Sequence, residues 1–159
     1  MAKTKLFLQR ITVLILGLST ALVLLAADYP NASDKKSQEG HIRVYISGVR
    51  QPKGQILCAL FRHRDDWLDR IYQGARAKQS SQGRVICDFP KVPHGHYALS
   101  LFHDVNSNTK LDKNWLGIPK EGYGFSRDPS IGFGPPGWDE TVFTHKGKMM
   151  RLSSKLRYP

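Results

Sequence analysis

Short runs of alternating apolar and polar residues, separated by glycine and proline, limit this chain to a β fold. In residues 41–49, Ile42, Val44 and Ile46 alternate with more polar side chains, which is the pattern of a half-buried strand. Five further strand-like runs lie at residues 55–61, 84–89, 96–103, 141–145 and 148–157. Six short strands joined by turns predict a single all-β sandwich over residues 41–159.

Two segments depart from this strand pattern. Asp65 is a suitable N-cap, and the residues from there to Gly74 place apolar side chains at helical spacing, which predicts one short helix. The apolar side chains are those of Trp67, Leu68, Ile71 and Tyr72. From Asp104 to Trp138 the chain is rich in Gly, Pro, Asn and aromatic residues and has no period. A loop of that length in a small domain commonly carries function or needs a ligand to order it.

The first 27 residues have the composition of an export signal. Lys3, Lys5 and Arg10 precede an uncharged apolar run that ends at two alanines, where a signal peptidase can cut. That run of about 17 residues also reaches the lower limit for crossing a bilayer, so an uncleaved anchor over residues 6–27 is the alternative. In both cases residues 28–40 form a polar linker, and the domain is expected in the periplasm or outside the cell.

The mature domain is basic, and its cysteines fit an exported protein. Without the three basic residues of the signal, 21 basic residues remain against 13 acidic ones, a formal net charge of +8. Because these charges are scattered, we expect a solvated basic surface and no nucleic-acid partner; attraction to anionic envelope polymers or lipid headgroups is the functional alternative. Cys58 and Cys87 lie in two predicted strands and are expected to form a disulfide in an oxidising compartment. Two free buried thiols are the alternative.

The segment from His103 to Asp112 reads HDVNSNTKLD and has the spacing of a calcium loop. Counted from Asp104, side-chain oxygens stand at the first, third, fifth and ninth positions, contributed by Asp104, Asn106, Asn108 and Asp112. The seventh position, Lys110, contributes a backbone carbonyl. Hard oxygen donors at this spacing predict a structural calcium site. Trp115 occupies the twelfth position, where a bidentate glutamate belongs, and Glu121 is the expected replacement. The alternative is an Asx-rich turn in which Asp and Asn bind their own backbone and no ion.

These same motifs resemble a known family. Residues 102–112 (FHDVNSNTKLD) and 117–126 (GIPKEGYGFS), together with VPHGHYA at 92–98, GPP at 134–136 and LRY at 156–158, closely resemble the bacterial domain-of-unknown-function family 2141. The resemblance covers residues 41–158 and implies an exported protein with no established activity. Val105 and Thr109 depart from the family pattern, which has an acid and a glycine there, and both changes weaken the calcium interpretation.

A looser resemblance implies an architecture. The turn Pro93-x-Gly95-x-Tyr97, followed by a strand and the Asp104-x-Asn106-x-Asn108 loop, is similar to the prealbumin-like domains of bacterial surface proteins. In those domains comparable loops bind calcium structurally. The resemblance implies a Greek-key β-sandwich and supports architecture more than function.

Two other chemistries remain as alternatives. Three histidines, His94, His96 and His103, offer imidazole ligands for zinc or copper. His96 and His103 face opposite sides of a regular strand and lie about 23 Å apart along it, so we interpret His103 as support for the Asp104 carboxylate. Asp104 paired with Asp112 or Glu121 can also be interpreted as the carboxylate pair of a small envelope enzyme. No catalytic residue is assigned, because the serines lack a base beside them.

The long loop also concentrates aromatic side chains, namely Trp115, Tyr123, Phe125, Phe133 and Trp138. They form either a stacking surface for sugars or other apolar ligands or the internal packing of a compact loop, and the intervening glycines favour packing.

Taken with the strand pattern and the export signal, these features favour one function: an exported β-sandwich module with a structural calcium loop. Its expected partner is a cell-envelope component or another protein.

Overall fold

The computed structural model describes residues 38–79, 84–132 and 134–159. The predicted signal or anchor, nearly all of the predicted linker and Phe133 lie outside the described residues. The described elements are strands β1 (Glu39–Ser47), β2 (Gln55–Phe61), β3 (Gln73–Arg76), β4 (Lys78–Gln79), β5 (Val85–Pro93), β6 (Gly95–Asp104), β7 (Tyr123–Phe125), β8 (Phe143–His145) and β9 (Met149–Lys155), a 3-10 turn η1 (Arg64–Asp66) and helix α2 (Trp138–Thr141).

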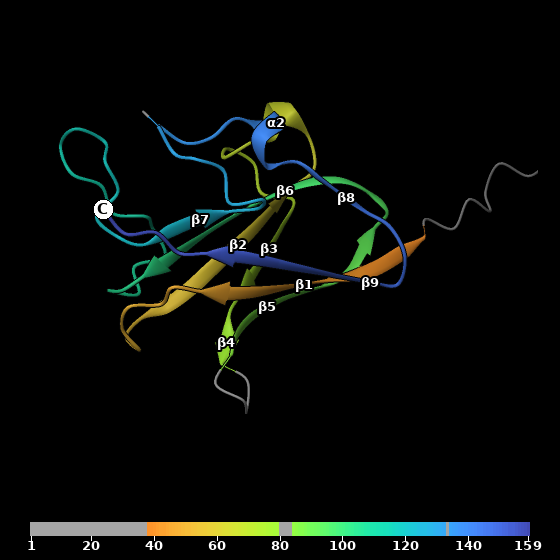
Figure 1. Cartoon of the computed structure of the whole chain (residues 1–159), viewed down its shortest axis with the longest axis horizontal. Helices are drawn as coiled ribbons and strands as arrows, with labels where there is room; N and C mark the ends of the chain where they lie inside the picture. Colours follow the sequence, from red (N-terminus) through yellow and green to blue (C-terminus); the bar gives the residue numbers. More distant parts are fainter. Residues whose placement is uncertain (1–37, 80–83, 133) are drawn as a thin grey trace, which may run out of the picture. The chain divides into compact units, whose positions relative to one another are not determined.

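These strands form two sheets, which confirms the predicted all-β sandwich with one short helix. One sheet has the order β4-β5-β1-β9, in which β1 runs antiparallel to β5 and parallel to β9 (Figure 1). The other has the order β3-β2-β6-β7, and β8 pairs with the first residues of β6. Strand β6 therefore runs the length of the second sheet, and its last residue, Asp104, begins the long loop.

The core lies between the sheets and follows the period-two pattern of the sequence. Ile42, Val44 and Ile46 of β1 are buried, as predicted, and pack with apolar residues of the facing sheet such as Leu99 and Leu101 of β6. A disulfide between Cys58 of β2 and Cys87 of β5 links the two sheets directly and confirms the predicted pairing. No helix within the described residues is long and apolar enough to cross a membrane.

The short helix predicted over residues 65–74 is wrong. Only Arg64–Asp66 form a 3-10 turn, and Leu68 adopts a left-handed backbone conformation with φ of 62°, which ends any helical path. The backbone N–H of Tyr72 then donates to the carbonyl of Leu60 at 2.8 Å, and the chain continues as β3 along the edge of β2. The one α-helix among the described residues, α2, lies instead at Trp138–Thr141.

Within its described residues, the segment from Asp104 to Trp138, predicted to lack regular structure, contains strand β7 and ends where helix α2 begins. Strand β7 pairs with Ser100–Phe102 of β6, and α2 ends the segment. The C-terminal residues hold the returning chain, because Tyr123 and Arg157 exchange backbone hydrogen bonds of 2.9 and 2.8 Å. The loop from Asp104 to Glu121 is therefore fixed at both ends by the second sheet.

Candidate functional site

The base of the long loop is built around the buried carboxylate of Asp104. Its Oδ1 accepts a hydrogen bond from the backbone N–H of Asn108 at 2.9 Å, and its Oδ2 accepts one from that of Thr109 at 2.8 Å. Gln55, opposite Asp104 in the β2–β6 register, donates its Nε2 to Oδ2 at 2.6 Å. Asp104 thus ties the first turn of the loop to the end of the sheet.

The same hydrogen bonds set the ionisation of Asp104. Burial by itself would raise the pKa of this carboxyl, but hydrogen bonds from Gln55 and from the backbone of Thr109, Asn108 and Ser107 outweigh it. The pKa of Asp104 therefore lies below its ordinary value, and the group is an anion at neutral pH. An anion that accepts several N–H donors stabilises the loop more than a neutral acceptor would.

Neighbouring strands brace this base from two sides. Gly54 has φ of +75°, and a Cβ at this position would lie 2.1 Å from the backbone oxygen of Asp104, so only glycine fits. The ring of His103 is buried, with Nε2 at 2.6 Å from the carbonyl of Lys53 and Nδ1 at 2.7 Å from the hydroxyl of Tyr158. His103 supports the loop through its neighbours, because neither of its nitrogens bonds to Asp104.

Of the predicted calcium ligands, the four Asp and Asn side chains of residues 104, 106, 108 and 112 lie together in the structure. Nδ2 of Asn106 donates to Asp112 at 2.7 Å, and Nδ2 of Asn108 donates to the other oxygen of Asp112 at 3.1 Å. Oδ1 of Asn108 accepts the backbone N–H of Lys110 at 2.8 Å, and the Lys110 side chain is exposed. This arrangement is that of an Asx-rich turn, in which side chains satisfy one another and the local backbone.

Glu121, the residue predicted to complete the ligand set, has a different task. It is buried, and its two oxygens accept the backbone N–H groups of Val105 at 2.9 Å and Asp112 at 3.0 Å. The carboxylate thus clamps the outgoing and returning parts of the loop. Both oxygens are engaged with the backbone, so Glu121 is not placed as the missing bidentate ligand.

Whether calcium fits this loop depends on the side-chain oxygens that face its centre. The oxygen chemistry suits the ion, but the amide NH2 groups of Asn106 and Asn108 face Asp112, so both amides would have to turn for their oxygens to bind a cation. Among the described residues, no group of three or more His, Cys, Asp or Glu side chains is placed to hold a metal ion. Calcium binding stays a prediction.

Beyond this base the loop narrows to a tight hairpin that presents apolar side chains. Lys113 and Pro119 form an isolated β-bridge, and Oδ1 of Asn114 accepts the backbone N–H groups of Leu116 and Ile118, both at 3.0 Å. Three side chains are left on the outside, with Trp115 90%, Leu116 60% and Ile118 48% exposed. We call these three residues the apolar tip; the teal segment that follows β6 carries it (Figure 1).

The other loop aromatics do not share this exposure. Phe125 is buried and Trp138 half-buried, and both rings lie against Trp67, at centroid distances of 6.0 and 6.2 Å. Tyr123 is half-buried at 6.1 Å from Phe125. The prediction of internal packing therefore holds for these three described residues and fails for Trp115.

The three histidines considered for a transition metal are not brought together. His103 lies at the end of β6 with both nitrogens hydrogen-bonded. His96, near the start of β6, is exposed, and its Nδ1 lies 3.2 Å from the hydroxyl of Thr144.

The sequence did not single out His145, which is buried with neither nitrogen hydrogen-bonded. Its ring centroid lies 5.4 Å from that of His94. Burial and the nearby His94 lower the pKa of His145, so it remains neutral near pH 7.

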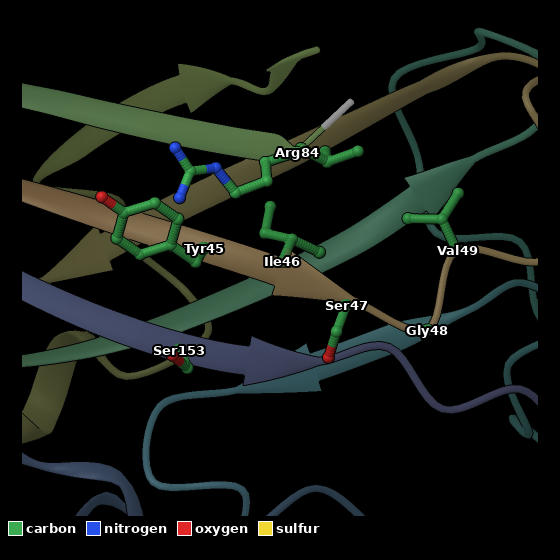
Figure 2. A pocket seen from close by; sticks show the side chains of 8 residues that line it. Tyr45, Ile46, Ser47, Gly48, Val49, Arg84 and Ser153 are labelled. Atoms are coloured by element: carbon green, nitrogen blue, oxygen red, sulfur yellow. The ribbon is translucent and has the colours of Figure 1, made fainter. Parts of the chain in front are cut away.

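A separate surface hollow of about 470 Å³ lies at the end of β1. Figure 2 shows its lining by Tyr45, Ser47, Arg84 and Ser153, and the guanidinium of Arg84 lies 5.6 Å from the centroid of the Tyr45 ring. The described residues that line the hollow include no Asp, Glu, His or Cys. The carboxylates of the long loop are engaged as hydrogen-bond acceptors, Asp104 and Glu121 with backbone N–H groups and Asp112 with asparagine amides.

Comparisons with known proteins give one match. A family model described as "Uncharacterized protein conserved in bacteria (DUF2141)" matches residues 44–153, a range that includes the long loop and runs from within β1 to within β9. No curated protein and no solved structure matches the chain.

Proposed function

The chain belongs to the bacterial family DUF2141, and we propose that it is an exported module that binds a component of the cell envelope through its apolar tip. The family match confirms the resemblance that the motifs predicted, and the family is described as uncharacterized. The proposal therefore depends on the site itself.

The observation that carries the proposal is the exposure of Trp115, Leu116 and Ile118 on a loop whose backbone is internally fixed. A contiguous exposed apolar group on a domain of this size is a common mark of an interaction surface. Because Asp104, Glu121 and Asn114 already hold the loop, binding requires little ordering of the chain, which favours affinity. The predicted export signal of residues 1–27 and the disulfide support placing this surface in the envelope.

Binding to isolated envelope fragments tests the proposal. We expect Leu116→Ser to weaken sedimentation of the chain with envelope fragments about tenfold or more, because a buried leucine side chain contributes roughly 1.5–3 kcal/mol. Both proteins carry the same residues 1–27, so an N-terminal anchor would contribute equally to each and the difference reports the tip. Equal binding of the two proteins would contradict the proposal.

We also propose that calcium binds the base of the loop and stabilises it, through Asp104, Asn106, Asn108, Asp112 and the Lys110 carbonyl. The clustering of these oxygen donors supports this proposal, and the engagement of Glu121 with the backbone limits the site to weak affinity, with a dissociation constant of roughly 10⁻⁴–10⁻³ M. Calcium at 10 mM should then add about 1.4–2.7 kcal/mol to the free energy of unfolding.

Thermal unfolding with and without calcium tests this part of the account. The expected rise in melting temperature is about 5–12 °C for a domain of this size. Asp112→Asn removes one carboxylate and should abolish the rise, while Asp139→Ala, a change outside the loop, should retain it. A melting temperature that does not respond to 10 mM calcium would show that the loop is an Asx-rich turn without an ion.

A further inference from the structure

We infer that the apolar tip inserts into the headgroup region of an anionic phospholipid bilayer. This inference rests on the proposed function and names its partner class. It adds a membrane contact within the folded domain, separate from any N-terminal anchor. Three features of the loop lead to it: the kind of apolar side chains at the tip, the charges around them, and the position of the tip on the domain.

The side chains of the tip suit a membrane interface. Tryptophan prefers the headgroup level of bilayers because its ring is amphipathic, and leucine and isoleucine gain free energy when they leave water for the acyl boundary. The side chains of Trp115, Leu116 and Ile118 are all exposed, because the Asn114 side chain binds the backbone N–H groups of this turn on its inner side. A sugar site would instead need free hydrogen-bonding groups beside the aromatic ring, and the Oδ1 of the neighbouring Asn114 is already used by two backbone N–H groups.

The charges around the tip are those that anionic lipids attract. Lys110, Lys113 and Lys120 flank it in the sequence, and all three are exposed. The nearby carboxylates are turned toward the loop's own donors: Asp112 is half-buried and accepts two asparagine amides, and Glu121 is buried on two backbone N–H groups, whereas the three lysines are exposed to solvent. Long lysine side chains beside an inserted apolar group can reach the lipid phosphates.

The tip also lies at one end of the domain, where a flat membrane can reach it. The loop that carries it begins at Asp104, the last residue of β6, whereas the β8–β9 turn begins after His145, which pairs with Gly95, the first residue of β6. At about 3.3 Å per residue, the ten residues of β6 separate these two ends by roughly 30 Å. Lysines of the β8–β9 turn, Lys146 and Lys148, therefore provide a matched control surface at the far end.

Quenching of Trp115 by brominated lipids tests the inference with the whole chain in vesicles. The difference in fluorescence between the natural chain and Trp115→Phe isolates the tip from Trp67 and Trp138 and from any N-terminal anchor. We expect bromine on the acyl chains to quench Trp115 in vesicles of phosphatidylglycerol and phosphatidylcholine. Lys113→Glu should reduce the inserted fraction about fivefold or more, and Lys146→Glu should leave it unchanged.

The outcomes separate the two proposals. Trp115 that remains unquenched, while Leu116→Ser still weakens binding to envelope fragments, would overturn the lipid partner and leave the proposed function standing with a protein or polymer partner. Equal quenching in pure phosphatidylcholine, with no effect of Lys113→Glu, would overturn the requirement for anionic lipid. Absence of both quenching and tip-dependent envelope binding would overturn both proposals.

Discussion

Reduction of the Cys58–Cys87 disulfide is expected to lower the free energy of unfolding by about 3–4 kcal/mol. The two cysteines are 29 residues apart in sequence, and on the chain-entropy model a bond that closes a loop of that length restricts the unfolded chain by this amount. The bond also joins β2 to β5, so its loss removes the covalent link between the sheets. For a domain of this size we expect the melting temperature to fall by roughly 10–20 °C.

The measurement compares thermal unfolding of oxidised and reduced protein. Because both cysteines are buried, reduction is carried out in denaturant, followed by refolding with reductant and a count of free thiols. Oxidised protein taken through the same denaturation and refolding is the control. The double variant Cys58→Ala and Cys87→Ala should unfold at a similarly low temperature. An unchanged melting temperature with two titratable thiols would contradict the structural role of the bond.

Replacement of Asp104 by alanine is expected to destabilise the domain by about 3–5 kcal/mol. Gln55 Nε2 and the backbone N–H of Thr109 lose their acceptor, and the N–H of Asn108 keeps only its longer bond of 3.2 Å to Asn106 Oδ1. Hydrogen bonds to a charged group contribute roughly 1.5–3 kcal/mol each. Asp104→Asn keeps one acceptor oxygen and should cost less. The exposed Asp69, changed to alanine, is the control and should alter the unfolding free energy little.

The ionisation of Asp104 adds a pH dependence with a definite sign. Its folded pKa is below the unfolded value of about 3.9, so its contribution is fully present above that value and is lost as the pH falls through the folded pKa. Denaturant unfolding of Asp104→Asn should therefore depend less on pH below about 4 than that of the natural chain. Identical pH dependence in the two proteins, or an Asp104→Ala variant as stable as the natural chain, would contradict the anchoring role.

The strands were predictable because their signal is local. Alternation in β1 predicted its correct inward face, and the expectation of an oxidising compartment predicted the cysteine pair. The helix at residues 65–74 was wrong because Trp67 packs at 5.0 Å against the ring of Phe61, and because the free edge of β2 offers backbone partners to β3. Tertiary contacts of this kind override a helical pattern in a short segment.

The long loop shows what spacing alone leaves open. The sequence correctly grouped Asp104, Asn106, Asn108 and Asp112, but oxygen spacing is the same for an ion site and for an Asx-rich turn. Glu121 was rightly placed near the loop, yet its role as a backbone clamp depends on where the returning chain crosses. Strand β7, with three residues, is too short for a period to be visible.

The apolar tip had a sequence signal that was easy to misread. Trp115, Leu116 and Ile118 stand between lysines in a segment rich in glycine, and aromatic residues nearby in the chain do pack inward. What turns these three side chains outward is the side chain of Asn114, which accepts two backbone N–H groups. A side-chain-to-backbone interaction of this kind depends on local geometry, and no hydrophobic period in the sequence predicts it.

Photo-crosslinking in living cells tests most directly whether the apolar tip is the binding surface. A benzophenone amino acid is placed at Leu116 or, as the matched control, at Ile71, because these positions are similarly exposed, 60% and 57%. The readout is local, so an N-terminal anchor does not affect it. We expect adducts with envelope material from position 116 and few from position 71. Equal adducts from both positions, or none from position 116, would contradict this expectation.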